Sequence, residues 1–239
     1  MELNEIREIL GFENYEWYMK VDASLKKNDA ILVLPPPGWG SSIGYTVCYT
    51  IYHLCQDRER TIGIVSGHQD INRMIYDHIS DILKNNKKLK KLFGDFYSKD
   101  TSWNRDMIRV IGSDPTNPNP SIAFTTINRG FEGMKPDLTI CDGVINSFTN
   151  ISKIQDKFSE IYLRTNKQTL LISHRYSAMN QFIQDPRWSD VIKIQAEDYG
   201  MSTCSKRFPM KELIKMQSMI EEGIWDSIYM QETDHKNIW

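Results

Sequence analysis

A short stretch rich in proline and glycine has the residue types of a phosphate-binding loop. The apolar run Ala30–Leu34 leads directly into it, and a helix-like stretch follows from Ile43. Backbone amides in such a turn cradle phosphate oxygens, and a serine hydroxyl at its end contacts Mg²⁺. We therefore assign phosphate or nucleotide contacts to six residues of this loop: Pro37, Gly38, Trp39, Gly40, Ser41 and Ser42.

One position of this loop departs from the usual pattern. Such a loop normally ends in Gly-Lys-Ser or Gly-Lys-Thr, and Ser41 occupies the lysine position here. The charge that would steady the β- and γ-phosphates is therefore missing, whereas the amides and the Ser42 hydroxyl remain. A stiff strand-to-helix turn without a ligand is the alternative interpretation, because three prolines restrict the backbone.

A second apolar run ends in an aspartate about a hundred residues later. Leu138–Cys141 is followed by Asp142, which we assign to a Mg²⁺ site together with Ser42. A second acid usually stands beside this aspartate and polarises the attacking water, but the neighbour here is Gly143. The alternative interpretation is a cap at the end of a strand.

A third apolar run, Thr169–Ile172, is followed by Ser173, His174 and Arg175. In many nucleotide-driven motors this position senses the γ-phosphate, so we assign His174 and Arg175 to the candidate catalytic set. His174 alone does not justify a catalytic role, and ordinary loop chemistry is the alternative. A basic cluster forms a weaker candidate for nucleic-acid contact, with a solvated helix end as its alternative; it comprises Lys87, Lys88, Lys90 and Lys91.

The chain alternates apolar strand-like runs with helical patterns, which predicts an α/β fold with a parallel sheet covered by helices on both faces. In such sheets, ligand sites form where loops leave the carboxyl ends of the strands. Four polar loops fit that description, those after Leu34, Ser66, Cys141 and Ser173. The predicted strands are 30–34, 61–66, 107–111, 121–126, 138–141, 169–173 and 191–196, and the predicted helices are 43–54, 69–85, 152–164, 176–184 and 211–222.

Composition limits the function classes. The 239 residues are 40% hydrophobic and 25% charged, with a net charge of −2, so nucleic-acid binding would need a local basic patch. The four cysteines have no CxxC spacing, which predicts a reducing intracellular setting without a zinc knuckle. No apolar run is long enough to span a bilayer. We expect one domain over residues 1–239, with a helical segment 1–28 packed on it.

Taken in order, these segments resemble the ATPase domain of the large terminase subunit, the DNA-packaging motor of tailed phages. The resemblance covers most of the chain. Pro36–Ser42 looks like the family's Pro-Pro-x-x-Gly-Lys-Ser loop, and His174–Ser177 looks like its coupling motif. Further segments that are similar to family motifs are Ile64–His68, Lys91–Asp95, Gly130–Leu138, Asp185–Trp188 and Tyr229–Gln231.

The resemblance implies a P-loop NTPase-like fold of the ASCE/RecA-like class, and ATP and Mg²⁺ as cofactors if nucleotide binding is retained. It also implies double-stranded DNA as a partner, with a homo-oligomeric ring and a portal, a small terminase subunit or a separate nuclease subunit. In such a ring an arginine from a neighbour completes the site, and the candidates by position are Arg129 and Arg175. We expect no nuclease domain in this chain, no membrane contact and a virus- or prophage-encoded protein in the host cytoplasm.

The degenerate motifs leave three hypotheses open. The first is a terminase-like domain with weak or lost hydrolysis that acts in packaging or its assembly. The second is an active packaging ATPase that uses substitute or trans-acting residues, with Lys26, Lys27, Glu132 and Asp137 as stand-ins. The third is a non-enzymatic P-loop-like binding module. Nucleotide affinity separates the third hypothesis from the others, and hydrolysis rate separates the first from the second.

Overall fold

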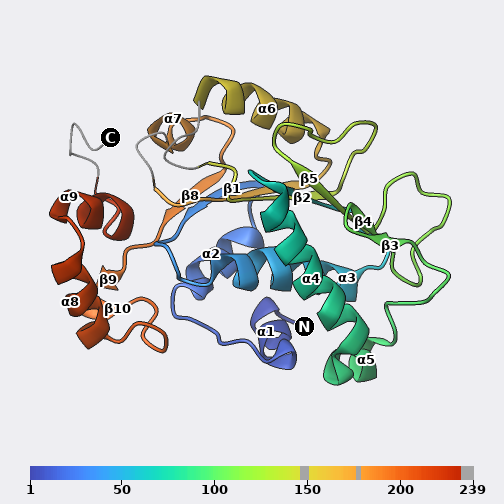
Figure 1. The fold of residues 1–239 in the computed structure, drawn as a ribbon, viewed down its shortest axis with the longest axis horizontal. Coiled ribbons are helices and arrows are strands. Elements are labelled where there is room, and N and C mark those ends of the chain that lie inside the picture. The colour runs from blue at the N-terminus through green and yellow to red at the C-terminus, as the bar shows by residue number, and fades with distance from the viewer. Residues whose placement is uncertain (146–150, 176–178, 233–239) are drawn as a thin grey trace.

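The computed structural model describes residues 1–145, 151–175 and 179–232. Within this part of the chain, the main sheet has eight strands and its order shows that the chain crosses over repeatedly (Figure 1). In spatial order the strands are β3 (Trp103–Asn104), β4 (Met107–Ile108), β5 (Ile122–Thr126), β2 (Ile62–Ser66), β6 (Leu138–Asp142), β7 (Gln168–Ile172), β1 (Ala30–Leu34) and β8 (Asp190–Lys193).

The sheet is mostly parallel, as the alternating pattern predicts. Strands β5, β2, β6, β7, β1 and β8 pair in parallel, and an antiparallel ladder joins β3, β4 and β5 at one edge. Parallel strands covered on both faces need side chains that are apolar throughout. Strand β1 is apolar throughout, and every residue of β1, β2 and β6 is buried, although Ser66, Thr139 and Asp142 are polar.

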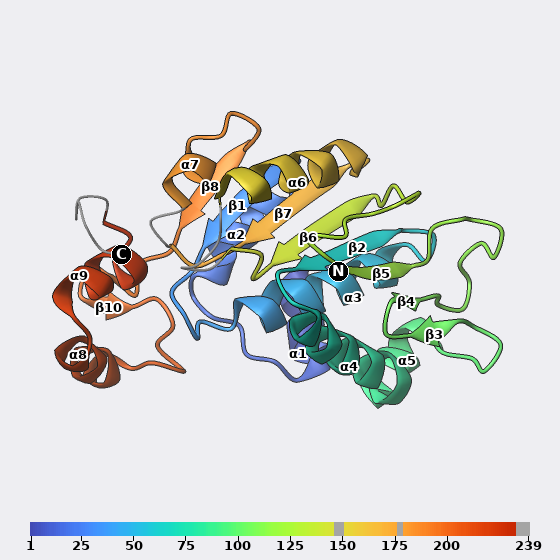
Figure 2. The same ribbon diagram turned by 45° about the horizontal axis from the view of Figure 1, so that its top comes forward.

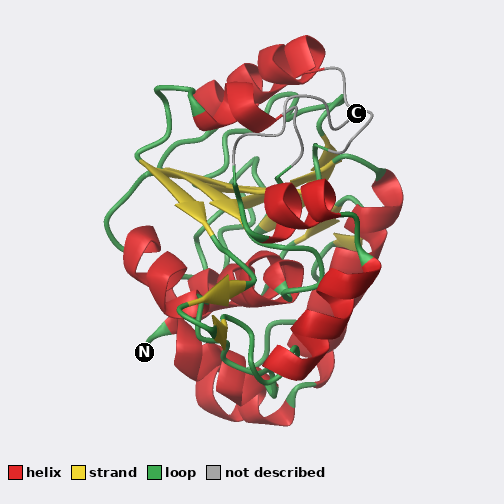
Figure 3. Cartoon of the chain, turned by 90° about the vertical axis from the view of Figure 1, so that its left-hand side faces the viewer, coloured by secondary structure: helices red, strands yellow, loops and turns green. Residues whose placement is uncertain are grey.

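Helices cover both faces of the sheet, so the predicted α/β P-loop NTPase-like layering is confirmed (Figures 1 and 3). One face carries α1 (Leu3–Leu10), α2 (Tyr18–Leu25), the π-helix η1 (Ser42–Val47), α3 (Cys48–Gln56), α4 (Gln69–Asn85) and α5 (Lys87–Phe93). The other face carries α6 (Ile151–Arg164) and α7 (Met179–Ile183). Residues 1–28 contain two helices separated by a loop, and Ile6, Val21 and Leu25 among others belong to the same buried cluster as one face of the sheet.

The C-terminal part forms a small unit beside the sheet rather than one closing helix. It contains the hairpin β9 (Glu197–Asp198) and β10 (Met201–Ser202), then α8 (Met210–Met219), α9 (Glu222–Ile224) and the π-helix η2 (Trp225–Tyr229). Figure 2 shows this unit next to the ends of β1 and β8. The predicted helix 211–222 therefore stops early, because the backbone of Ile220 is extended.

Several other boundaries differ from the sequence-based ones. The predicted strand 107–111 is only two residues long, and strand 191–196 ends at Lys193. The predicted helix 176–184 is observed from Met179, because residues 176–178 lie outside the described residues. The link 112–120 joins two antiparallel strands, β4 and β5. In the described residues, no helix has both the length and the apolar character that crossing a membrane requires.

Candidate nucleotide site

The four polar loops predicted from the sequence lie at the carboxyl ends of four neighbouring strands. They follow β2, β6, β7 and β1, which are consecutive neighbours in the strand order. The strands are parallel, so their carboxyl ends point the same way. The loop after Leu34 and the residues Asp142 and His174 are therefore brought together, as the sequence predicts.

The loop Pro35–Ser41 turns sharply at two glycines. Gly38 and Gly40 both take positive φ angles, of 85° and 78°. A Cβ on Gly40 would lie 3.0 Å from the ring of Tyr15, so glycine is required there for both conformation and space. The Tyr18 hydroxyl donates to the Gly40 carbonyl at 3.0 Å. The next amides begin a helix, and first-turn amides have no intrahelical acceptor, which leaves them available to an anion.

Trp39 points away from the loop and into the C-terminal unit. Its side chain is fully buried and stacks on Phe208, with ring centroids 4.5 Å apart and an interplanar angle of 20°. The indole Nε1 donates to the Thr203 hydroxyl at 3.1 Å, and the ring meets Tyr229 edge-on. Trp39 thus ties the loop to the C-terminal unit instead of contacting phosphate through its ring.

Asp142 lies at the end of β6 against the helix that follows the loop. Its Oδ2 accepts a hydrogen bond of 2.6 Å from Thr46 Oγ1, and the Ser42 hydroxyl is near enough to favour the ionised carboxylate. Burial raises the pKa of Asp142 above its ordinary value, while the two hydroxyls and nearby His174 act in the opposite direction. Asp142 is therefore a buried carboxylate that one hydroxyl fixes beside the loop, at the position assigned to the metal from the sequence.

This donor set fits Mg²⁺ in a nucleotide site. Mg²⁺ is usually held by one or two carboxylates together with substrate phosphates and water. Asp142 and Ser42 supply one carboxylate and one hydroxyl, beside amides that suit phosphate. The described residues contain no cluster of three or more histidine, cysteine, aspartate or glutamate residues, so a metal site made of protein ligands alone is not found in them.

His174 and Arg175 follow β7, between the loop and Asp142. The Nδ1 of His174 lies 3.0 Å from the carbonyl oxygen of Pro35, which places the imidazole at the base of the loop. Arg175 is buried, and its guanidinium donates to the Gln231 carbonyl. Burial lowers the pKa of Arg175. His174 therefore faces the loop, whereas Arg175 contacts the C-terminal segment.

Arg129 and the lysine cluster lie elsewhere. Arg129 follows β5, and four strand spacings separate β5 from β1, so Arg129 starts roughly 19 Å from the loop. Its side chain is exposed. Lys87, Lys88 and Lys91 are exposed on α5, whereas Lys90 forms an ion pair with Asp95 at 2.7 Å. None of these residues belongs to the loop site within one copy of the chain.

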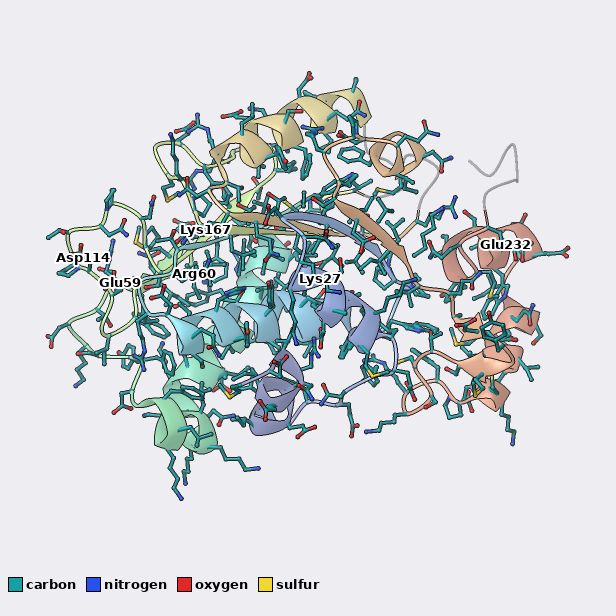
Figure 4. The ribbon with its side chains drawn as sticks, turned by 180° about the vertical axis from the view of Figure 1, so that it is seen from behind. Lys27, Glu59, Arg60, Asp114, Lys167 and Glu232 are labelled. Atoms are coloured by element: carbon teal, nitrogen blue, oxygen red, sulfur yellow. The ribbon has the colours of Figure 1, made fainter. Side chains whose placement is uncertain are left out.

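Three residues that could replace the missing lysine or the missing acid lie at the amino ends of the strands, away from the loop. Lys26 and Lys27 lead into β1 at its amino end, and Figure 4 labels Lys27 there. Asp137 precedes β6 and accepts hydrogen bonds from Thr61, with an ion pair to Lys167 at 3.3 Å. The loop leaves the carboxyl ends of these strands, so these side chains lie at the opposite ends of the strands from it.

Lys193 is a candidate that the sequence reasoning missed. Strand β8 lies beside β1, and Lys193 pairs in register with Leu34, the residue just before the loop. Burial and the nearby charge of Arg175 lower the pKa of Lys193. Lys193, Lys20 and Trp17 also line a hollow of about 640 Å³ between α2 and the C-terminal unit. Only the strand order reveals this lysine, because β1 and β8 are far apart in the sequence.

Comparison with solved structures identifies the fold. The ATPase domain of the large terminase of Thermus phage P74-26 superposes with a TM-score of 0.62 over 97% of this chain and 98% of that one, at 12% sequence identity. The chain has the fold of a phage large terminase ATPase domain. The large terminase of another thermophilic bacteriophage, solved in complex with ADP, has a TM-score of 0.55 at 9% identity, and that of bacteriophage HK97 has 0.50 at 13%.

The terminase fold is recognised here from structure. No family profile and no curated protein matches the sequence. The chain covers 50% of the ADP-bound terminase and 44% of the HK97 terminase. Within this fold, the loop, Asp142 and His174 lie at the carboxyl ends of neighbouring strands, and Ser41 and Gly143 stand where a lysine and a second acid are expected from the sequence.

Proposed function

We propose that this chain is a terminase-like DNA-packaging motor domain that binds Mg²⁺–nucleotide at Pro37–Ser42 and hydrolyses it weakly or not at all. One observation carries the proposal, namely the hydrogen bond by which Thr46 holds the Asp142 carboxylate against the helix that follows the loop. Mg²⁺, when bound, would screen the phosphate charges. Asp142 and Ser42 would hold it, and the loop amides would orient the phosphates.

Weak hydrolysis is the expected consequence of the two substitutions. Loss of one electrostatic donor to a reacting group typically lowers the rate by about 10²–10³. Loss of a positioned general base lowers it by a further factor of about 10²–10⁴. Gly143 has a φ of 63°, a conformation that suits glycine, so the backbone itself is adapted to a position without a carboxylate.

An active ATPase with substitute residues is the second candidate, and two observations favour it. Lys193 lies beside the start of the loop and supports a role as a cation in cis. Arg129 is exposed and far from its own loop, which suits a role in trans within a ring, whereas Arg175 is buried and bonded to Gln231. Under this candidate, His174 would report the phosphate state through its contact with Pro35.

The hollow lined by Trp17, Lys20 and Lys193 would hold the nucleotide base. Its volume of about 640 Å³ is within the usual range for small-ligand sites. Trp17 is buried, and its Nε1 donates to no acceptor within the described residues. A purine ring nitrogen would satisfy that donor, and apolar residues from Ile194 to Met210 would contact the ring. The remaining hypothesis, a non-enzymatic P-loop-like binding module, differs from the other two in nucleotide affinity.

The likeness to terminase ATPase domains supports a proposal for the wider setting. We propose duplex DNA as the partner and a homo-oligomeric ring as the assembly, working with a portal, a small terminase subunit or a separate nuclease subunit. The host cytoplasm is the proposed location. The lysines 87, 88, 90 and 91 remain a weaker candidate for DNA contact, since Lys90 is already paired with Asp95.

Phosphate release in the presence of duplex DNA tests the proposal. The wild-type chain is expected to turn over near background, and Lys193→Met is expected to change that little. The matched control is Lys20→Met, which removes the other lysine of the same hollow. Fast wild-type turnover that Lys193→Met abolishes and Lys20→Met preserves would reject the weak-hydrolysis proposal in favour of the active ATPase.

A further inference from the structure

A second small hollow lies further along the sheet from the loop, where β5 ends and α4 begins. It encloses about 120 Å³. Three arginines line it from three different elements: Arg73 on α4, Arg105 in the turn between β3 and β4, and Arg129 after β5. Figures 1 and 2 both show these elements beside one another. Residues distant in sequence thus bring three guanidinium groups to one place.

The positive charge in this hollow is largely uncompensated. Within the described residues, Arg105 and Arg129 form no ion pair and no side-chain hydrogen bond. Arg73 contacts Asp70 at 3.3 Å, with both side chains well exposed, and such a pair contributes little. Asp106 is the one carboxylate among the lining residues. Three like charges repel one another unless an anion lies between them.

Asn72 supplies an independent sign of a ligand. It is 4% exposed and lines the hollow, and its Nδ2 donates to the Thr125 carbonyl at 2.7 Å. That bond fixes the orientation of the amide and leaves Oδ1 buried without a partner. Buried acceptors without partners are rare in folded proteins. We expect Oδ1 to accept a hydrogen bond when a ligand is present. The donor would be either the ligand itself or an arginine guanidinium that moves closer when an anion binds.

We propose that this hollow is a phosphate-binding site built by Arg73, Arg105 and Arg129, with Asn72 orienting the bound group or a guanidinium. Guanidinium groups bind phosphate oxygens in pairs of parallel hydrogen bonds, which favours arginine over lysine at such a site. The phosphate comes either from the backbone of duplex DNA or from a nucleotide held by a neighbouring copy. The choice of source rests on the proposed function, whereas the site itself does not.

Arginine side-chain NMR tests the site directly. Inorganic phosphate is titrated into the full chain while the Nε–Hε signals of Arg73, Arg105 and Arg129 are followed, each assigned by an Arg→Lys substitution. All three signals are expected to shift together and saturate, and Arg105→Gln with Arg129→Gln should abolish the shift of Arg73. Arginine signals that do not move on titration would overturn the proposal. This readout is independent of any phosphate that binds at Pro37–Ser42.

Two further arms identify the source of the phosphate. If it is DNA, Arg105→Gln with Arg129→Gln should weaken binding of a short duplex about tenfold and reduce the salt dependence by about two contacts. The control, Lys211→Gln with Lys215→Gln, removes equal charge from exposed positions on α8 and should change affinity less. If the source is a neighbour's nucleotide, MgATP should promote self-association of the wild type but not of the arginine variant. Unchanged duplex affinity together with unchanged association would also overturn the proposal.

Discussion

The Thr46 hydroxyl donates a 2.6 Å hydrogen bond to the Asp142 carboxylate, which joins the helix after the loop to the end of β6. Ser42 lies one turn earlier on the same helix and favours the ionised form of the same carboxylate. Both residues belong to η1, a π-helix, and this form is often found at functional sites. The Thr46 bond thereby fixes Asp142 in a buried position.

Removing the Thr46 hydroxyl should destabilise the fold. Thr46→Val keeps the shape of the side chain but leaves the buried carboxylate one donor short, a loss of about 1.5–3 kcal/mol for a bond to a charged group. For a chain of this size, the corresponding fall in Tm is roughly 3–12 °C. Thr50→Val is the control, since Thr50 bonds only to the Thr46 carbonyl on the same helix. Calorimetric unfolding that showed equal losses for both variants would contradict the role given to Thr46.

A glutamate introduced at position 143 should not restore ATP hydrolysis. Gly143→Glu places a side chain at a φ of 63°, at a cost of roughly 1–2 kcal/mol, and its Cβ would lie 3.3 Å from Ile71 Cδ1. We expect Ser41→Lys to improve nucleotide affinity but restore little turnover, alone or combined with Gly143→Glu. Gly143→Asn tolerates this backbone better and should lose less stability. Rapid phosphate release by Ser41→Lys alone would show that Gly143 does not mark a lost base.

The Trp39–Phe208 stack should couple the loop to the C-terminal unit. In a double-mutant cycle, Trp39→Phe and Phe208→Leu are expected to show a coupling energy of about 0.5–1.5 kcal/mol in unfolding experiments. Trp39→Phe combined with Trp103→Phe is the control pair. Trp103 is in the edge strand β3, so these two effects should add. Additive effects for Trp39 and Phe208 as well would mean that the stack contributes nothing of its own.

His53 should make the fold sensitive to acid. Burial and the charge of Arg60 lower its pKa to about 4, against 6.5 as the ordinary value. Between these values the unfolded chain binds a proton that the folded chain does not, so stability falls as pH drops from about 6.5 towards 4. The loss is of the order of 2–3 kcal/mol. Urea unfolding across this range should show a smaller pH dependence for His53→Gln, and an unchanged dependence would exclude His53 as its source.

The sequence predicted the parallel core of the fold well, because buried strands need continuous apolar runs. Such runs mark Ala30–Leu34, Leu138–Asp142 and their neighbours, and polar residues mark where each strand ends. The gathering of the loop, Asp142 and His174 followed from strand polarity alone. This part of the candidate site therefore needed no knowledge of side-chain packing.

Long-range pairing and short elements could not be predicted in this way. Lys193 becomes a candidate only because β8 lies beside β1, and Arg73, Arg105 and Arg129 meet only in three dimensions. The two-residue strands β9 and β10 are too short to carry a periodic pattern. Helix α5 begins at Lys87 because of a cap that the apolar pattern does not reveal. The Asn86 side chain accepts a hydrogen bond from the Leu89 amide.

Calorimetric titration of ATP with and without Mg²⁺ into the wild type and Asp142→Asn tests the central claim most directly. We predict saturable binding by the wild type that strengthens with Mg²⁺, because Asp142 and Ser42 hold the metal beside the phosphates. Asp142→Asn keeps an acceptor for Thr46 and should bind ATP equally with and without Mg²⁺. An absence of binding heat for the folded wild type under both conditions would contradict the claim that Pro37–Ser42 still serves a nucleotide.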